Sequence, residues 1–367
     1  MICEDAESWL TLQFLPGLGP GRIARLLAHW GRAEEILEHR AEAAARLPGL
    51  ARILDDDSAL NAARDQARRE LERIARQDIS LISCVSGHYP WALREIADRP
   101  VLLYVQGEVA LLAQPMLAII GARSASGYGL RTARRFAAAA AERGLAVVSG
   151  AAYGIDAAAH QGALQAGGKT VAVLGCGVDV AYPAAHRGLL RDIAQSGAVV
   201  SEFPLGTRPE AFRFPIRNRI ISGLSRAVLV VEAGEKSGSL ITARLALDQG
   251  REVLAIPGSI DSLKSSGAHW LIQQGATLIQ RVEDVFEAMA WSVPAGTNAK
   301  AAPSPEVPLA PEERQVLQAL DAYPADIDRI AQQCGLALTV LQPLLLALEL
   351  QGLVRRLPGQ LYERVRP

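Results

Sequence analysis

The chain has 367 residues, 50% of them hydrophobic, and its 38 basic and 39 acidic residues leave a formal net charge of −1. Such a chain can bury one large core and carry smaller domains beside it. Its apolar runs are broken before they reach the ~18 residues of a membrane span, and residues 1–20 lack a signal-peptide pattern. We therefore expect a cytoplasmic protein of two or three domains without membrane contact, whose affinity for phosphate would come from local clusters of charge.

The cysteines give no sign of a metal or disulfide framework. They are far apart in the sequence, with no C-x-x-C pair and no histidine at ligand spacing: Cys3, Cys84, Cys176 and Cys334. We expect reduced thiols, no structural zinc and no cofactor.

Residues 1–78 predict a small helical domain that resembles a helix-hairpin-helix (SAM-like) fold. Within it, LPGLGPGRIARLL (15–27) places three glycines in a tight turn before an amphipathic helix. Free N–H groups at that helix start could hold a backbone phosphate. A purely structural αα-hairpin is the favoured interpretation, because acidic residues outnumber basic ones across 1–78.

Between residues 116 and 290, short β-type apolar runs alternate with helical patterns. The expected strands are MLAIIG, LAVVSG, TVAVLG, AVVSE, AVLVVEA and EVLAIPG, and the expected helices cover 127–143, 153–166, 184–195, 239–249 and 265–274. This alternation predicts an α/β fold, a Rossmann-like, doubly wound and mostly parallel sheet, within a domain spanning 79–293. Ligands of such sheets bind beyond the carboxyl ends of the strands, so the loops that follow the strands are expected to share one functional edge.

The first loop of that edge, GARSASGYG (121–129), opens a helix with small and basic residues, namely Gly121, Arg123, Ser124, Ser126 and Gly127. N–H groups, hydroxyls and a guanidinium at one point suit a phosphate. The spacing is not that of a dinucleotide site, and the next strand ends at Ser149 and Gly150 instead of an acidic residue for a ribose. The alternative is a glycine turn that only packs a helix on a strand.

Residues 208–226 combine arginines with aromatic rings. Phe212 and Phe214 lie among five arginines, with Glu210 as the one acidic residue; the arginines are Arg208, Arg213, Arg217, Arg219 and Arg226. Guanidinium groups can follow a phosphate backbone while rings stack on unpaired bases. We expect this segment to bind single-stranded nucleic acid at the same sheet edge as Arg123. The alternative is two core phenylalanines with a solvated rim of arginines.

A second helix start lies in EAGEKSGSLITARLA (232–246), with Lys236, Ser237, Gly238 and Ser239. Its amides and hydroxyls form a second place where an anion can be held. Residues 237–247 contain no acidic residue, which favours binding of a nucleic acid over hydrolysis of a nucleotide.

Asp156 and His160 lie four residues apart and share one face of the predicted helix 153–166. Such a pair could transfer protons or bind a metal. No third ligand is near in the sequence, so a structural hydrogen bond is the favoured interpretation.

Residues 294–308, PAGTNAKAAPSPEVP, predict a flexible linker because they lack a periodic apolar pattern. The segment 309–367 then follows the pattern helix, helix, turn, helix and β-ribbon, which resembles a winged helix. Residues 336–351, which include its third helix, contain no Lys or Arg. Reading of duplex DNA would need such side chains in the major groove, so protein docking or internal packing is the favoured role.

Taken in order, six motifs resemble the DNA-processing protein A (DprA or Smf) family across residues 116–279. They are GARSASGYG, SGAAYGIDAAAH, AVLGCGVDVAYP, SEFPLGTRPEAFRFPIRNRIISGLS, EAGEKSGSLITARLALDQGREVLAIPG and SGAHWLIQQGATLI. The resemblance implies a non-catalytic protein that binds incoming single-stranded DNA in natural transformation and protects it from nucleases. It also implies loading of the RecA recombinase and homodimerisation through the Rossmann-like domain.

Carried onto this chain, the family's strand-binding pocket covers small, basic and aromatic residues: Gly121, Arg123, Ser124, Phe212, Phe214, Arg217, Asn218 and Arg219, with Lys236, Ser237, Gly238 and Ser239 in the neighbouring loop. Two positions depart from the family's pattern. Ala122 stands where a serine is usual. Ala211 stands where a lysine is common, which leaves Arg208 and Arg213 as candidate substitutes for that charge.

Two other functions compete with strand binding. A Rossmann-like phosphoribohydrolase would release bases from nucleotides, and the absence of an acidic residue in 237–247 argues against it. A pure adaptor would dock a recombinase through residues 309–367 and bind no DNA itself. Incubation with nucleoside monophosphates and deletion of the C-terminal segment would separate these functions from the favoured one.

Overall fold

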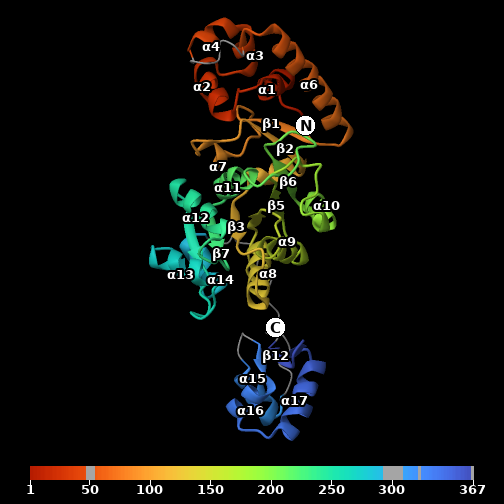
Figure 1. Cartoon of the computed structure of the whole chain (residues 1–367), viewed down its shortest axis with the longest axis vertical. Coiled ribbons are helices and arrows are strands. Elements are labelled where there is room, and N and C mark those ends of the chain that lie inside the picture. Colours follow the sequence, from red (N-terminus) through yellow and green to blue (C-terminus); the bar gives the residue numbers. More distant parts are fainter. Residues whose placement is uncertain (47–53, 292–308, 321–323, 365–367) are drawn as a thin grey trace. The chain divides into compact units, whose positions relative to one another are not determined.

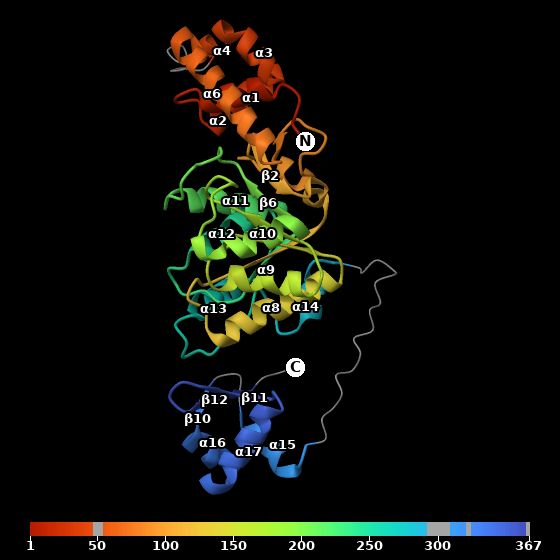
Figure 2. The same cartoon turned by 90° about the vertical axis from the view of Figure 1, so that its right-hand side faces the viewer.

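The computed structural model describes residues 1–46, 54–291, 309–320 and 324–364. They belong to two compact units, Met1–Thr297 and Asn298–Pro367, each described by itself. The larger unit joins N-terminal helices to a nine-stranded sheet, and the smaller unit contains a three-stranded sheet with helices (Figure 1, Figure 2). The predicted linker, 294–308, lies outside the described residues.

The N-terminal helices pack on one another and on the sheet. They are α1 (Ala6–Phe14), α2 (Pro20–Trp30), α3 (Ala33–Glu38), α4 (Arg40–Arg46) and α6 (Asp57–Arg76). Gly17, with a φ of 80°, makes the predicted turn before α2, and Asp56 caps α6 by accepting two backbone amides at 3.0 Å. Trp9 of α1 and Ile74 of α6 are buried in a core that is continuous with the core of the sheet.

The large sheet has the strand order β1-β2-β6-β5-β4-β3-β7-β8-β9. The pairs from β6 to β9 are parallel, whereas β2 pairs antiparallel with both β1 and β6. The strands are β1 (Ser80–Ser83), β2 (Leu102–Gly107), β3 (Met116–Ile120), β4 (Ala146–Ser149), β5 (Thr170–Val173), β6 (Ala198–Ser201), β7 (Ala227–Val230), β8 (Glu252–Ala255) and β9 (Thr277–Leu278). The predicted mostly parallel α/β sheet is confirmed.

Helices cover both faces of this sheet. On one side are α8 (Gly127–Glu142), α9 (Ile155–Gln165) and α10 (Arg187–Ser196), and on the other are α11 (Arg213–Leu224), α12 (Gly238–Asp248) and α13 (Ser266–Gln273) (Figure 1). Shorter helices are α7 (Trp91–Arg94) and α14 (Val282–Ala288), with 3-10 turns at Val109–Ala113 and Ala184–His186. Alternate residues of β3 point to opposite faces of the sheet. Ile119 belongs to the same hydrophobic core as Phe136 of α8, and Ala118 belongs to the same core as Ile220 of α11.

The direction of strand addition reverses at β3, which pairs with β4 on one side and with β7 on the other. After β3 the chain enters α8 on one face, and after β7 it enters α12 on the other face. The two loops, 121–126 and 231–237, therefore diverge and leave a crevice at the carboxyl ends of neighbouring strands. This switch point is where ligands bind in doubly wound sheets.

Two features of the sheet domain were not predicted. Helix α11 has no polar stripe, because Arg217 and all residues from 219 to 224 are buried, so its sequence lacks the pattern of a surface helix. The strands β1 and β2 overlap the apolar runs LISCV and VLLYVQG, and their antiparallel pairing depends on distant partners and not on a local pattern.

The smaller unit has the predicted winged-helix order with one further short strand, β10. Its elements are α15 (Pro311–Ala319), β10 (Ala325–Asp326), α16 (Ile327–Cys334), α17 (Leu338–Leu350), β11 (Val354–Leu357) and β12 (Leu361–Arg364). The strand order is β10-β12-β11, and Asp326 caps α16 by accepting the Arg329 amide at 2.8 Å. In the described part of the chain no single helix is long and apolar enough to cross a membrane; α16 and α17 meet that test only as a pair bent by 106°.

Candidate nucleic-acid interface

A groove of about 750 Å³ opens at the switch point between β3 and β7. Its lining comes mainly from residues 120–123 at the end of β3, residues 209–218 leading into α11 and residues 234–242 at the start of α12, with Ala152, Asp156 and Tyr182 beside them. The sequence-predicted residues in its lining are Gly121, Arg123, Phe214, Arg217, Asn218, Lys236, Ser237, Gly238 and Ser239. The fold thus brings three separate motifs to one place.

An aromatic and cationic cluster forms one wall of this groove. The guanidinium of Arg123 lies 5.4 Å from the centroid of the Phe214 ring. Tyr182 stacks on the same ring, with centroids 5.4 Å apart and planes 27° apart. Tyr182 was not predicted as a site residue, although it stands in the motif AVLGCGVDVAYP. An aromatic side chain in a loop of the functional edge is the sequence signal that could have identified it. Tyr182 is 39% exposed, so its ring can be reached from solvent.

Arg217 lies beneath the groove and is 5% exposed. Its Nη1 donates to the Gly150 carbonyl at 2.8 Å and to the Val173 carbonyl, and its Nε donates to Oδ1 of Asn218 at 3.2 Å. Desolvation lowers the pKa of Arg217 to about 10, with the nearby Asp156 opposing the shift. The side chain therefore stays positively charged at neutral pH while it ties the ends of β4 and β5 together.

Gly150, predicted as a binding residue, has a packing role in this arrangement. A Cβ on Gly150 would lie 2.6 Å from the guanidinium of Arg217, so only glycine leaves room for that side chain. Ser149 is also turned inward, where its hydroxyl donates to the Ile119 carbonyl at 2.7 Å. Neither residue lines the groove, although Gly150 lines a small pocket beside it together with Arg123, Tyr182 and Phe214, so contact of either residue with a ligand stays a prediction.

The start of α12 faces the groove with polar groups. The hydroxyl of Ser237 accepts the Ser239 amide at 3.4 Å and lies 2.6 Å from the Ser239 hydroxyl. Lys236 is exposed beside them. Gly238 has open space around it, since a Cβ there would meet no atom within 4 Å. The positive end of the helix dipole, the ammonium group and the hydroxyls together favour an anion at this point.

The start of α8 is already occupied by a carboxylate of the chain itself. Glu232, which follows β7, accepts the Ser126 amide at 2.9 Å and the Ser126 hydroxyl in a short hydrogen bond. A Cβ on Gly129 would lie 2.5 Å from this carboxylate. The expectation that Ser126 holds a phosphate is therefore corrected, because Glu232, 3% exposed, already binds it. Gly127 beside it is exposed, and its role in binding stays a prediction.

Helix α11 separates arginines that are close together in the sequence. At about 100° per residue, Phe214 and Arg217 face the groove while Arg219 points to the opposite side. There Arg219 is 6% exposed and its Nη2 lies 2.6 Å from Oε2 of Glu202. Arg213 turns away to pair with Glu210 at 3.3 Å. The expectation that Arg213 and Arg219 line the groove is corrected for this reason.

Two further predicted residues, Ser124 and Phe212, are exposed but do not line the groove. Phe212 is 58% exposed, and the guanidinium of Arg213 lies 5.0 Å from its ring centroid. Both residues are close in sequence to lining residues, so they lie at the margin of the groove.

Asp156 and His160 have separate hydrogen-bond partners. Asp156 lines the groove and accepts the Ala152 amide at 3.3 Å, and burial raises its pKa. His160 is fully buried, with Nδ1 2.7 Å from the Thr170 hydroxyl, and desolvation lowers its pKa to about 3. The described residues include no group of three or more His, Cys, Asp or Glu placed to hold a metal ion.

The chain is an α/β protein with a doubly wound sheet, a cationic and aromatic groove at the switch point of that sheet, and a winged helix after it. The family model for DNA recombination-mediator protein A matches residues 80–290, and the model for the DprA winged helix domain matches residues 300–360. The chain belongs to the DNA recombination-mediator protein A (DprA/Smf) family.

Two sequence relatives match large parts of the chain. Protein Smf of Escherichia coli K12 is 38% identical over 99% of this chain and 96% of its own length. DNA processing protein DprA of Streptococcus pneumoniae R6 is 47% identical over 57% of this chain and 74% of its own length.

Two solved structures are similar in fold. DNA processing protein A from Streptococcus pneumoniae aligns with a TM-score of 0.67 and 37% identity, over 76% of this chain and 97% of that chain. DNA processing protein A from Helicobacter pylori, described for its single-stranded DNA binding mode, aligns with a TM-score of 0.53 and 30% identity, over 58% of this chain and 95% of that chain.

Proposed function

We propose that this protein binds single-stranded DNA in the switch-point groove. The observation that carries the proposal is the contact of Arg123 and Tyr182 with the Phe214 ring, next to Lys236 at the start of α12. Cationic groups and free amides attract phosphates, and exposed rings stack on unpaired bases. Neither contact depends on base identity, so the expected sequence preference is low.

Substitution of Arg123 tests the groove directly. The expected loss in Arg123→Ala is about 1.5–3 kcal/mol, the contribution of a charge-assisted hydrogen bond, which is at least tenfold in Kd for a labelled oligothymidylate. The salt dependence of log K should also flatten by about 0.7 per lost phosphate contact. Arg69→Ala removes the same charge from an exposed position on α6, outside the groove, and is the matched control. If both variants bound with the same affinity as the wild type, the proposal that single-stranded DNA binds in this groove would be wrong.

Duplex DNA provides the second comparison. Stacking on Phe214 and Tyr182 requires bases that are unpaired, because paired bases are already stacked on their neighbours. An oligonucleotide should therefore bind more tightly alone than after annealing to its complement. Equal affinity for both forms would indicate phosphate binding without base stacking.

We propose that binding occurs without catalytic turnover. Residues 237–247 lack an acidic side chain, the start of α8 is filled by Glu232, and Asp156 is held by the Ala152 amide. Glu232 and Asp156 are thus already engaged in hydrogen bonds within the described chain, which disfavours a role as general base in a phosphoribohydrolase. Incubation with nucleoside monophosphates should release no free base. Release that depends on Asp156 would favour the enzyme instead.

The cellular role we propose is the protection of incoming single strands in natural transformation and their transfer to the RecA recombinase in the cytoplasm. Membership of the DNA recombination-mediator family supports this proposal. Bound oligonucleotide should resist single-strand nuclease, and RecA should displace single-strand binding protein faster in the presence of this chain. Failure of RecA loading with normal strand binding would limit the role to protection.

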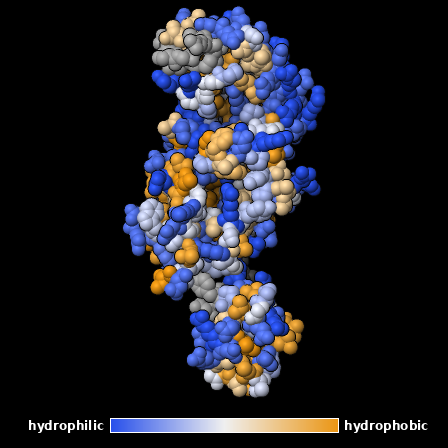
Figure 3. Space-filling model, in the orientation of Figure 1, coloured by the Kyte–Doolittle hydropathy of each residue, from blue (hydrophilic) through white to orange (hydrophobic). Residues whose placement is uncertain are grey.

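We also propose that two copies associate through the Rossmann-like domain. Helices α12 and α13 expose Ile241, Leu247 and Trp270 at 46%, 57% and 43%. Figure 3 shows hydrophobic surface on the side where these helices lie. Clustered apolar side chains at a surface favour a protein interface. Light scattering should give a molar mass of twice the 39.2 kDa of one chain. Trp270→Glu should lower the measured mass, whereas Val85→Glu, at another exposed apolar position, should leave it unchanged.

A further inference from the structure

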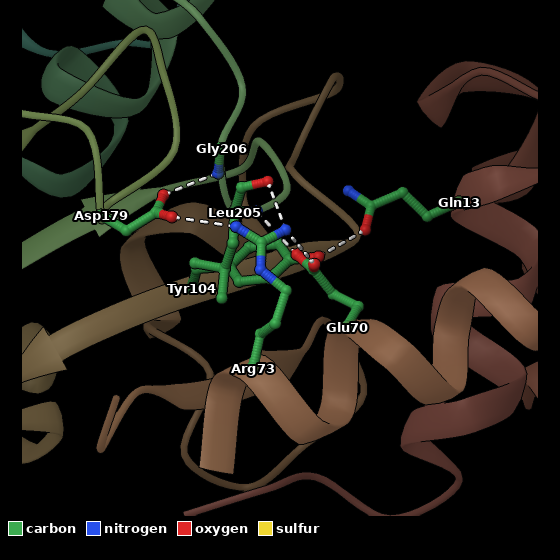
Figure 4. Close-up of polar contacts among 7 residues, drawn as sticks. All are labelled: Gln13, Glu70, Arg73, Tyr104, Asp179, Leu205 and Gly206. Carbon is green, nitrogen blue, oxygen red and sulfur yellow. Dashed lines mark hydrogen bonds and ion pairs between the residues drawn. The ribbon is translucent and has the colours of Figure 1, made fainter. Parts of the chain in front are cut away.

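Helix α6 of the N-terminal region contacts two loops of the sheet domain through a polar network (Figure 4), whose residues are not among those that line the groove. Oε1 of Glu70 accepts the Leu205 amide at 2.6 Å, and Nη1 of Arg73 donates to the Leu205 carbonyl at 3.0 Å. Nη2 of Arg73 donates to Asp179 at 3.1 Å, and Asp179 accepts the Gly206 amide at 2.7 Å. Arg73 therefore joins one helix to two separate loops.

The network leaves little room for rearrangement. The side chains of Glu70 and Asp179 are 4% and 15% exposed. Gly206 has a φ of 75°, and a Cβ there would lie 3.1 Å from Nη2 of Arg73. A Cβ on Gly177 would lie 2.6 Å from Oδ1 of Asp179. The backbone of both loops is thus held against the side chains that bind it, which sets the positions of the loops closely.

Both loops lead to the aromatic wall of the groove. The loop after β5 contains Asp179 and, three residues later, Tyr182. The loop after β6 contains Leu205 and continues into α11, whose second residue is Phe214. An amide-to-carbonyl hydrogen bond of 3.0 Å joins the two loops directly. The stacked rings therefore come from the two segments that Arg73 holds.

We propose that Arg73 is a positioning residue for strand binding, which holds Tyr182 and Phe214 in their stacked arrangement through Asp179 and Leu205. The inference rests on the proposed function of the groove. Rings that are already placed lose less conformational freedom when a base stacks on them, so a held wall binds more tightly than a loose one. The N-terminal helical region thereby contributes to strand binding without touching the strand.

The test compares two arginines of the same helix. Arg73→Ala should weaken binding of a labelled oligothymidylate by between about twofold and 30-fold, the usual range for coupling through packed side chains. Arg76→Ala is the matched control, because Arg76 is one turn away, 77% exposed and paired with Glu72 at 3.3 Å. It should bind like the wild type. Circular dichroism shows whether each variant folds, and Asp179→Asn replaces Arg73→Ala if the latter does not.

A double-mutant cycle with Tyr182→Ala separates positioning from general damage. When Tyr182 is absent, Arg73→Ala should cause less than half of its former loss, measured as the logarithm of the Kd ratio. Equal losses in both backgrounds, or an Arg73→Ala variant that binds as tightly as Arg76→Ala, would overturn the inference while leaving the groove intact. A wild-type chain that binds no oligothymidylate would defeat the proposed function and this inference together.

Discussion

Replacement of Arg219 by methionine tests whether this arginine serves the fold instead of the strand. Arg219 and Glu202 are both 7% exposed at the side chain, with Nη2 and Oε2 2.6 Å apart. In Arg219→Met the Glu202 carboxylate stays buried and loses its counter-charge. Asp98 also loses a contact with Arg219, at 3.3 Å, but its side chain is exposed and the loss there should be small. Removal of one partner from a buried pair costs about 3–5 kcal/mol of unfolding free energy. The folded fraction of the variant should still bind oligothymidylate with the wild-type Kd.

The double variant Arg219→Met with Glu202→Met is the matched control, because it removes the buried charge together with its partner. Burial raises the pKa of Glu202 even beside Arg219, so desolvation outweighs their attraction and most of the lost stability should return. Urea unfolding followed by circular dichroism gives the free energies, and fluorescence anisotropy gives the Kd. Normal stability combined with weak strand binding in Arg219→Met would refute this assignment and return Arg219 to the binding site.

Three further predictions concern other parts of the molecule. Folding lowers the pKa of His160 from 6.5 to about 3, so as the pH falls the unfolded chain binds this proton before the folded chain does. The free energy of unfolding should therefore drop by up to about 1.4 kcal/mol per pH unit below pH 6.5. Urea unfolding at pH 7 and pH 5 should show a smaller drop in His160→Gln than in the wild type. Gly129→Ala should destabilise the chain by about 1–3 kcal/mol through its clash with Glu232, whereas Gly188→Ala in open helical space should not, as measured by thermal unfolding. Deletion of residues 298–367 should preserve most single-strand affinity in a mobility-shift assay, and its loss would favour the adaptor function.

The sheet and its functional edge could be predicted because their signals are local. Apolar runs and helical periods from 116 to 290 match the strands β3 to β8 and the helices α8, α9, α10, α12 and α13, and parallel strands bring the loops that follow them to one edge. Arg123 and Lys236 lie in the loops that follow β3 and β7, so the same pattern predicted both at the functional edge. Their placement needed no knowledge of distant contacts.

The remaining site residues depended on contacts that are remote in sequence. Ser126 binds Glu232, 106 positions later, so the helix start could be predicted but not the carboxylate that fills it. The sequence gives no signal that distinguishes Arg217 from Arg219. Helix α11 is buried on nearly all sides, and Arg217 faces the groove while Arg219 faces Glu202. Tyr182 reaches Phe214 from another loop, a contact that no periodic pattern encodes.

Amide hydrogen exchange with and without oligothymidylate locates strand binding most directly, because it reports on every segment at once. We expect slower exchange on binding in residues 121–123 and in the segment 234–240, which contribute to the groove, and no change in α15 to β12. Protection confined to the C-terminal unit or to the start of α2, with residues 234–240 unchanged, would contradict the central claim that single strands bind at the switch point.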